Sequence, residues 1–263
     1  MDELMSIKGG AQERYEEYEE LLLKRDRLYK ECDSILIEYT RQFGDLIAGN
    51  FELKIECIKT KKSIAYCQKQ INMGREIDMM DMKGEIEDAM RLYYDEFKVM
   101  LAENKRAKEA KGVDEYTISR CKKIYRRLAK KLHPDINERT SQIEELIDLW
   151  LKITVAYKTS DVEALEQLEL LANGAMKRLG DKGFKVNIDD IEGKIAKVEN
   201  QINEMITSEP YIYRELLSDP DMIKAKKEEL HKEKEEFEKY LDELKETLDK
   251  LLLGGRGIIW TMD

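Results

Sequence analysis

The sequence predicts an all-α protein in which elongated helical hairpins and coiled coils flank a short central hairpin of helices. Charged residues make up 39% of the 263 residues, and there are only three prolines. Few segments favour strands, and this composition is typical of long helices with charged, solvated surfaces. Apolar residues recur at steps of three and four over most of the chain, which is the spacing of one buried helix face.

The first part of the chain predicts a flexible start at residues 1–10 and then a hairpin or bundle of long helices over residues 11–111. Gly44, Gly49 and Asn50 predict the end of a first helix at about residue 47, followed by helices over residues 51–73 and 78–110. The seven-residue repeat of the first helix leaves open whether its partner lies in this chain or in a second copy. Only Arg25 interrupts its apolar stripe, which consists of Tyr15, Tyr18, Leu22, Tyr29, Cys32, Leu36, Tyr39 and Phe43.

A strongly basic amphipathic helix is predicted over residues 118–132. Its apolar residues share one face: Ile118, Cys121, Tyr125, Leu128 and Leu132. The cationic residues lie between them: Lys122, Lys123, Arg126, Arg127, Lys130 and Lys131. Pro134 disfavours α geometry at His133, so the helix should end at about Leu132. We expect His133 and Asp135 to project from that end, beside the basic face.

Residues 125–135 read YRRLAKKLHPD, and this run resembles the second helix and HPD loop of the J domain, the DnaJ-like module that stimulates seventy-kilodalton heat-shock ATPases. Downstream, Trp150, Ile153, Ala156 and Tyr157 resemble the third helix of that family. They belong to a predicted stripe that also contains Ile143, Leu146 and Ile147. The resemblance implies an antiparallel hairpin with the loop at its tip, within a region of residues 112–180.

Three features depart from the family pattern, and one is that residues 161–171, DVEALEQLELL, stand in place of the charged fourth-helix motif of the family. Residues 111–116 do not fit the first J-domain helix, so the helix over residues 78–110 is the candidate that could supply it. Ile136 stands where the family commonly has a basic residue.

The resemblance implies a co-chaperone rather than an enzyme, with no cofactor of its own and a DnaK-like ATPase as its partner. His133, Pro134 and Asp135 would form the stimulating loop, with Asp135 reaching an arginine of the partner. The six cationic residues named above would dock on a negatively charged surface, with Lys122, Arg126 and Arg127 matching the contacting positions best. The hairpin core would contain Tyr125, Leu128, Leu132, Trp150, Ile153 and Tyr157.

Two other functions remain open. The chain could be a coiled-coil scaffold whose J-like hairpin is inactive. It could also bind nucleic acid, because residues 105–131 hold eleven basic and three acidic residues in a chain of net charge −10. The co-chaperone interpretation fails if the side chains of His133 and Asp135 are both buried, or if the chain's own acidic residues cover the basic row with no means of opening.

The last third predicts another helix over residues 161–179 and an antiparallel coiled-coil hairpin over residues 181–253. Pro210 and Pro220 bracket its connection. The two stripes are Ile188, Ile191, Ile195, Val198, Ile202 and Met205, and Leu230, Phe237, Leu241, Leu244, Leu248 and Leu251. Residues 254–263 form a Gly-rich tail whose Ile258, Ile259 and Trp260 would pack on the protein's own helices or on a partner.

Little in the sequence predicts catalysis or metal binding. The four cysteines are scattered singly, which predicts reduced and mostly buried thiols. The only histidine besides His133 is His231, in a charged helix, so the sequence predicts neither a metal set nor a catalytic relay. No leader or membrane-spanning segment is recognisable, and we expect a cytoplasmic protein.

Overall fold

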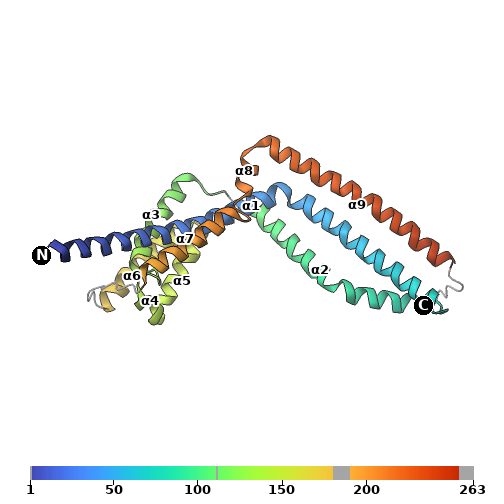
Figure 1. Cartoon of the computed structure of the whole chain (residues 1–263), viewed down its shortest axis with the longest axis horizontal. Helices are drawn as coiled ribbons and strands as arrows, with labels where there is room; N and C mark the ends of the chain where they lie inside the picture. The colour runs from blue at the N-terminus through green and yellow to red at the C-terminus, as the bar shows by residue number, and fades with distance from the viewer. Residues whose placement is uncertain (1, 111, 180–189, 255–263) are drawn as a thin grey trace. The chain divides into compact units, whose positions relative to one another are not determined.

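The computed structural model describes residues 2–110, 112–179 and 190–254. Within these ranges it contains nine helices and no strand, which confirms the all-α prediction. The predicted Gly-rich turn at residues 180–183 and the tail with Ile258, Ile259 and Trp260 lie outside the described residues. The helices fall into two compact units, and α1 (Asp2–Asn72) contributes to both (Figure 1).

Helix α1 differs from its prediction because it is one continuous helix rather than a flexible start followed by two helices. Gly44 does not break it. A Cβ at Gly44 would lie 1.7 Å from Asn104 Oδ1, so this glycine allows α2 to approach α1 closely. Asn50 is also kept in the helix, where its side chain donates to Leu230 O and to Glu233 Oε2, each at 2.9 Å. The helix ends two residues before Gly74, whose φ of 66° is the left-handed conformation that glycine favours.

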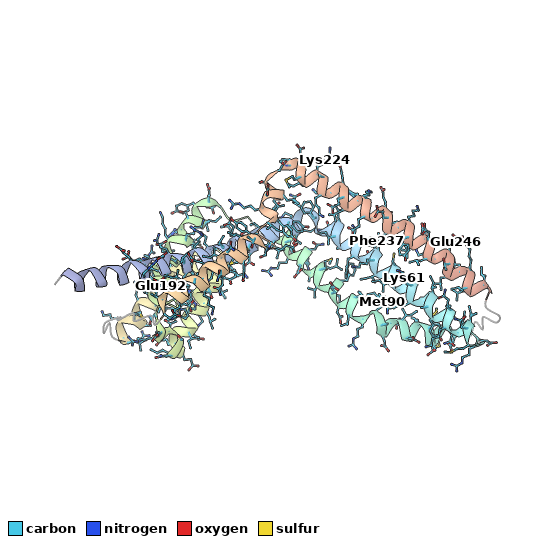
Figure 2. The ribbon with its side chains drawn as sticks, in the orientation of Figure 1. Lys61, Met90, Glu192, Lys224, Phe237 and Glu246 are labelled. Carbon is cyan, nitrogen blue, oxygen red and sulfur yellow. The ribbon has the colours of Figure 1, made fainter. Side chains whose placement is uncertain are left out.

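One unit contains residues 35–72 of α1 together with α2 (Met79–Glu109), α8 (Tyr213–Ser218) and α9 (Pro220–Gly254). Helix α2 runs antiparallel to α1, since Tyr66 contacts Asp81 and Arg41 donates to Ala107 O. Helix α9 runs parallel to α1, and Figure 2 marks Lys61 and Phe237 on these two helices and Met90 on α2. The apolar core here comprises Ile55, Tyr66, Cys67, Ile77, Met82, Ile86 and Met90, with Leu248, Leu251 and Leu252 packed against it.

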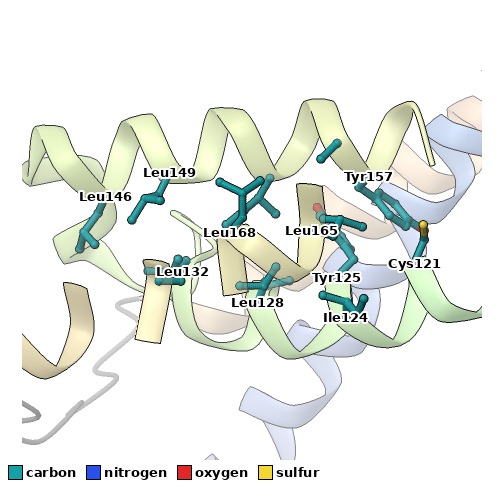
Figure 3. Close-up of a cluster of buried hydrophobic side chains, with 14 of the residues drawn as sticks. Cys121, Ile124, Tyr125, Leu128, Leu132, Leu146, Leu149, Tyr157, Leu165 and Leu168 are labelled. Atoms are coloured by element: carbon teal, nitrogen blue, oxygen red, sulfur yellow. The ribbon is translucent and has the colours of Figure 1, made fainter. Parts of the chain in front are cut away.

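The other unit contains residues 2–34 of α1, α3 (Glu115–Leu132), α4 (Glu138–Gln142), α5 (Glu144–Lys158), α6 (Val162–Leu179) and α7 (Ile191–Thr207). Helices α3 and α5 are antiparallel: Figure 3 shows Leu132 near Leu146 at one end and Cys121 near Tyr157 at the other. Helix α6 completes this core with Leu165, Leu168, Ala172 and Ala175. The predicted central hairpin is therefore part of a three-helix module formed by α3, α5 and α6.

The core predicted for this module largely agrees with the structure. Tyr125, Leu128, Leu132, Ile153 and Tyr157 are buried, and Trp150 is partly buried against them. On α5 the stripe is shifted from the prediction, because Ile147 is exposed and Leu149 is buried instead.

The predicted coiled-coil hairpin over residues 181–253 is not formed. Ile195, Val198 and Ile202 of α7 pack on Tyr18, Leu22 and Leu28 of α1, whereas α9 packs in the other unit on a different part of α1. Both apolar stripes are real, but a heptad stripe defines a buried face and not the helix that covers it. Each helix pairs with α1 rather than with the other.

The three-helix core gives a stability prediction. Leu128 is 1% exposed, so Leu128→Ala should lower the free energy of unfolding of this module by about 2–5 kcal/mol through lost burial and a residual cavity. Leu170 on α6 is 75% exposed, and Leu170→Ala should change the free energy of unfolding by about 0.5 kcal/mol or less. Urea unfolding followed by Trp150 fluorescence in a Trp260→Phe background measures both. Equal effects of the two substitutions would contradict the assigned core.

Candidate functional site

The candidate site is the turn that follows α3. Helix α3 ends at Leu132, as Pro134 predicts, and His133 takes the extended conformation with φ −61° and ψ 125°. The backbone amides of Ile136 and Asn137 both donate to His133 O, at 2.9 and 2.7 Å. The Asn137 side chain donates to Lys131 O and accepts from Arg139 N, so it ties the end of α3 to the start of α4. The HPD segment is thereby a fixed turn.

His133 does not project into solvent, in contrast to the prediction, since its exposure is only 4%. Its ring packs edge-on against Trp150 with centroids 4.8 Å apart. Nδ1 accepts the backbone N–H of Asp135 at 3.1 Å, which leaves Nε2 to carry the ring N–H and face Asp26 Oδ2 at 3.6 Å. One ring nitrogen therefore stabilises the turn, while the other faces α1.

The carboxylate of Asp26 on α1 contacts both helix α3 and the HPD turn that follows it. Tyr125 Oη donates to Asp26 Oδ2 at 2.7 Å, and Arg25 Nη2 lies 3.1 Å from Oδ1. Burial alone would raise the pKa of the Asp26 carboxyl, but the hydrogen bonds and charges of His133, Tyr125 and Arg25 outweigh it and hold that pKa below its usual value. Burial and the Asp26 charge together raise the pKa of the Tyr125 hydroxyl far above its ordinary value. Asp26 thus stays ionised and accepts hydrogen bonds at neutral pH.

Asp135, the last HPD residue, remains partly accessible, with 46% of its side chain exposed. Its carboxylate lies 3.6 Å from Arg25 Nη1 on α1. Burial opposes the charge of Arg25, but the Asp26 and Asp135 carboxylates outweigh burial and raise the pKa of its guanidinium. Arg25 therefore provides Asp135 with an arginine partner from within the same chain.

The six predicted cationic residues all lie on the exposed face of α3. Four of them contact acidic or polar residues of the same chain. Arg126 pairs with Glu20 and Lys130 with Glu19, both on α1. Arg127 forms two hydrogen bonds to Glu169 on α6, at 2.6 and 2.8 Å, and Lys131 donates to Asn173 at 2.8 Å. Lys122 and Lys123 are exposed and take part in no ion pair among the residues that the structure describes.

Ile136, the departure from the family pattern, is 5% exposed and packs in the apolar cluster that α1 forms with α7. A basic residue could not be buried there without a partner. Arg14 of α1 also pairs with Glu192 at the start of α7, at 2.9 Å (Glu192 is labelled in Figure 2). Residues 13–34 of α1 and helix α7, here called the α1–α7 arm, therefore contact the HPD turn through Ile136 as well as through polar groups.

The sequence did not predict that α1 packs on the α3–α5 hairpin beside the HPD turn. The candidate for the first J-domain helix, residues 78–110, forms α2 and belongs to the other unit. Arg25 and Asp26 of α1, and not residues of α2, contact the HPD turn. One signal was available, because Arg25 is the single interruption of the apolar stripe predicted for this helix.

Comparison of the chain with family models, with curated proteins and with solved structures finds no match. The J-domain resemblance therefore remains a prediction based on residues 118–157. Over the described ranges, no cluster of three or more His, Cys, Asp or Glu residues is arranged to hold a metal ion. None of the helices searched is both long enough and apolar enough to cross a bilayer.

Asp26 gives a stability prediction with a defined pH dependence. Asp26→Asn should lower the free energy of unfolding by about 1.5–3 kcal/mol at pH 7, because it removes a charged acceptor of buried hydrogen bonds. The folded pKa of Asp26 lies below its unfolded value, so its stabilisation is complete above about pH 4 and is lost as the pH falls through the folded pKa. The difference between wild type and variant should shrink on acidification.

Asp33→Asn is the matched control, since the Asp33–Lys158 pair is exposed and should contribute about 0–1 kcal/mol. Urea unfolding at several pH values measures both variants. A pH-independent effect of Asp26→Asn would contradict the role given to its charge.

Proposed function

We propose that the protein is a J-domain co-chaperone that stimulates ATP hydrolysis by a DnaK-like heat-shock chaperone. The observation that carries the proposal is the HPD turn at the tip of an antiparallel helix pair, directly after a helix with a cationic outer face. The chain would supply no catalytic group and no cofactor, since the ATPase belongs to the partner.

The charge distribution supports this function. The outer face of α3 presents the six predicted lysines and arginines, and two of them, Lys122 and Lys123 in the middle of the helix, take part in no ion pair among the described residues. Such a face attracts an acidic protein surface and accelerates association with it. Asp135 retains an accessible carboxylate beside this face, and it can exchange Arg25 for an arginine of the partner.

The alternative is a coiled-coil scaffold with an inactive J-like hairpin. One observation favours it: His133 is buried, and α1 and α6 contact much of the basic face. The cations of this face are all partly exposed, and the Arg126–Glu20 pair is exposed on both sides, although Glu19 beside Lys130 is buried. Exposed ion pairs contribute little net stability and can exchange with those of a partner. We therefore rank the co-chaperone first.

The test is single-turnover ATP hydrolysis by a cognate heat-shock ATPase at saturating concentrations of this protein. Wild type should accelerate hydrolysis, whereas His133→Gln and Asp135→Asn should lose about tenfold or more of that stimulation, because each removes a group needed at the docked turn. Asp148→Asn, an exposed change on α5, should retain it.

Equal stimulation by all four proteins would reject the assigned turn. No stimulation by any of them would favour the scaffold. Tight binding to nucleic acid that weakens steeply with salt and ignores His133→Gln would indicate the third function.

A further inference from the structure

The α1–α7 arm occupies the groups that the proposed co-chaperone would need for its partner. Arg25 Nη1 lies 3.6 Å from the carboxylate of Asp135. Asp26 accepts from Tyr125 and faces His133, and Glu19 and Glu20 pair with Lys130 and Arg126. Four residues within little more than two turns of α1 make these contacts, and their charges match those expected of an external partner.

The contact between α1 and α3 is made mainly by polar and charged groups, as expected of a contact that competes with a partner, and not by apolar groups as in a protein core. Its carboxylates pair with cations or, at Asp26, also accept from the Tyr125 hydroxyl, whereas the core of the α3, α5 and α6 module is apolar. Glu20 and Arg126 are each more than half exposed. This exposed pair is weak and exchanges readily, whereas Glu19, Arg25 and Asp26 are largely buried and hold the contact more firmly.

Packing along the seam between α1 and α3 is also incomplete. Two solvent-open hollows of about 150 and 240 Å³ lie along this seam, and Tyr125 and Tyr157 line both of them. One is lined by residues that include Glu20, Lys122 and Arg126, and the other by residues that include Lys30 and Tyr157. A permanent helix interface would normally be packed to the density of a protein interior.

Ile136 explains how such a polar contact is held. It is buried against α1 and α7, in the position where the family commonly places a basic residue. Ile136 and Leu23, which packs from α1 against the core of the α3, α5 and α6 module, are the apolar anchors of a contact that is otherwise polar. Such a contact is formed in the isolated protein and can open without disrupting the apolar core.

We propose that the α1–α7 arm is an autoinhibitory cover, which competes with the acidic surface of the chaperone for the HPD turn and the basic face of α3. This inference rests on the proposed function. If only a fraction of molecules is open, the apparent affinity for the chaperone falls by that fraction, while the maximal stimulation is unchanged. The cover therefore raises the concentration of this protein that gives half-maximal stimulation.

The experiment is a titration of ATPase stimulation against the concentration of full-length protein, with two variants that weaken the cover by opposite changes of charge. Glu20→Lys replaces the partner of Arg126 with a repelling cation, and Arg25→Ala removes the contact to Asp135. Each should lower the half-maximal concentration about two- to fivefold and leave the maximum unchanged. Because one variant raises the net charge and the other lowers it, a shared effect cannot come from charge alone.

Glu17→Lys is the matched control. Glu17 is an exposed glutamate three residues before Glu20, and its ion pair is with Arg14 on the same helix. Its substitution makes the same charge change without touching the basic face, so the half-maximal concentration should stay at the wild-type value.

The outcomes separate the two proposals. Stimulation by all proteins with equal half-maximal concentrations overturns the cover and leaves the co-chaperone function standing. A decrease with Glu17→Lys as large as that with Glu20→Lys also overturns the cover, since it shows a general effect of charge. Absence of stimulation by every protein at saturation overturns the co-chaperone function, and the cover with it.

Discussion

The hydrogen-bonded carboxylate of Asp26 is the interaction on which the candidate site depends. It accepts from Tyr125 in the middle of α3, faces His133 at its end and pairs with Arg25 beside it. A charge that is 87% removed from solvent costs several kcal/mol unless such partners compensate it, so each of them is fixed in place. The position of the HPD turn in this structure is therefore set as much by α1 as by the hairpin that carries it.

Contacts that stabilise α1 against the module would therefore have to break before the proposed chaperone could bind. The groups that would be needed by an external ATPase are the same ones that hold α1 against the module. The interior of the module consists mainly of its own apolar residues, such as Leu128, Leu132 and Leu146, while α1 adds Leu23 at its edge and accepts from Tyr125. Opening of the arm would thus expose the turn and the basic face while the three-helix core stays folded.

The sequence predicted the elements whose physical causes are local. Pro134 ends α3, the apolar spacing of Tyr125, Leu128 and Leu132 defines its buried face, and the lysines and arginines between them are exposed. It did not predict the partners of these elements. Gly44 was interpreted as a break because its role, a close approach of Asn104, depends on a residue sixty positions away.

The same limit applies to the site. Periodicity placed α7 and α9 in one hairpin, but an apolar stripe does not encode which helix covers it. His133 was expected at the surface because the family pattern places it in a loop, and its burial depends on Trp150, Asp26 and Arg25 from two other helices. In the sequence, Arg25 was only an interruption of an apolar stripe. The structure explains this charged residue, because Asp135 lies beside it.

The most direct test of this account is amide hydrogen exchange of the full-length protein, alone and with its ATP-bound chaperone. The account predicts that residues 133–142 are protected in both states, and that binding of the chaperone increases exchange in residues 14–30 of α1. Unchanged exchange in residues 14–30 while residues 133–142 respond to the chaperone would contradict it, because the turn would then be reached without displacement of the arm.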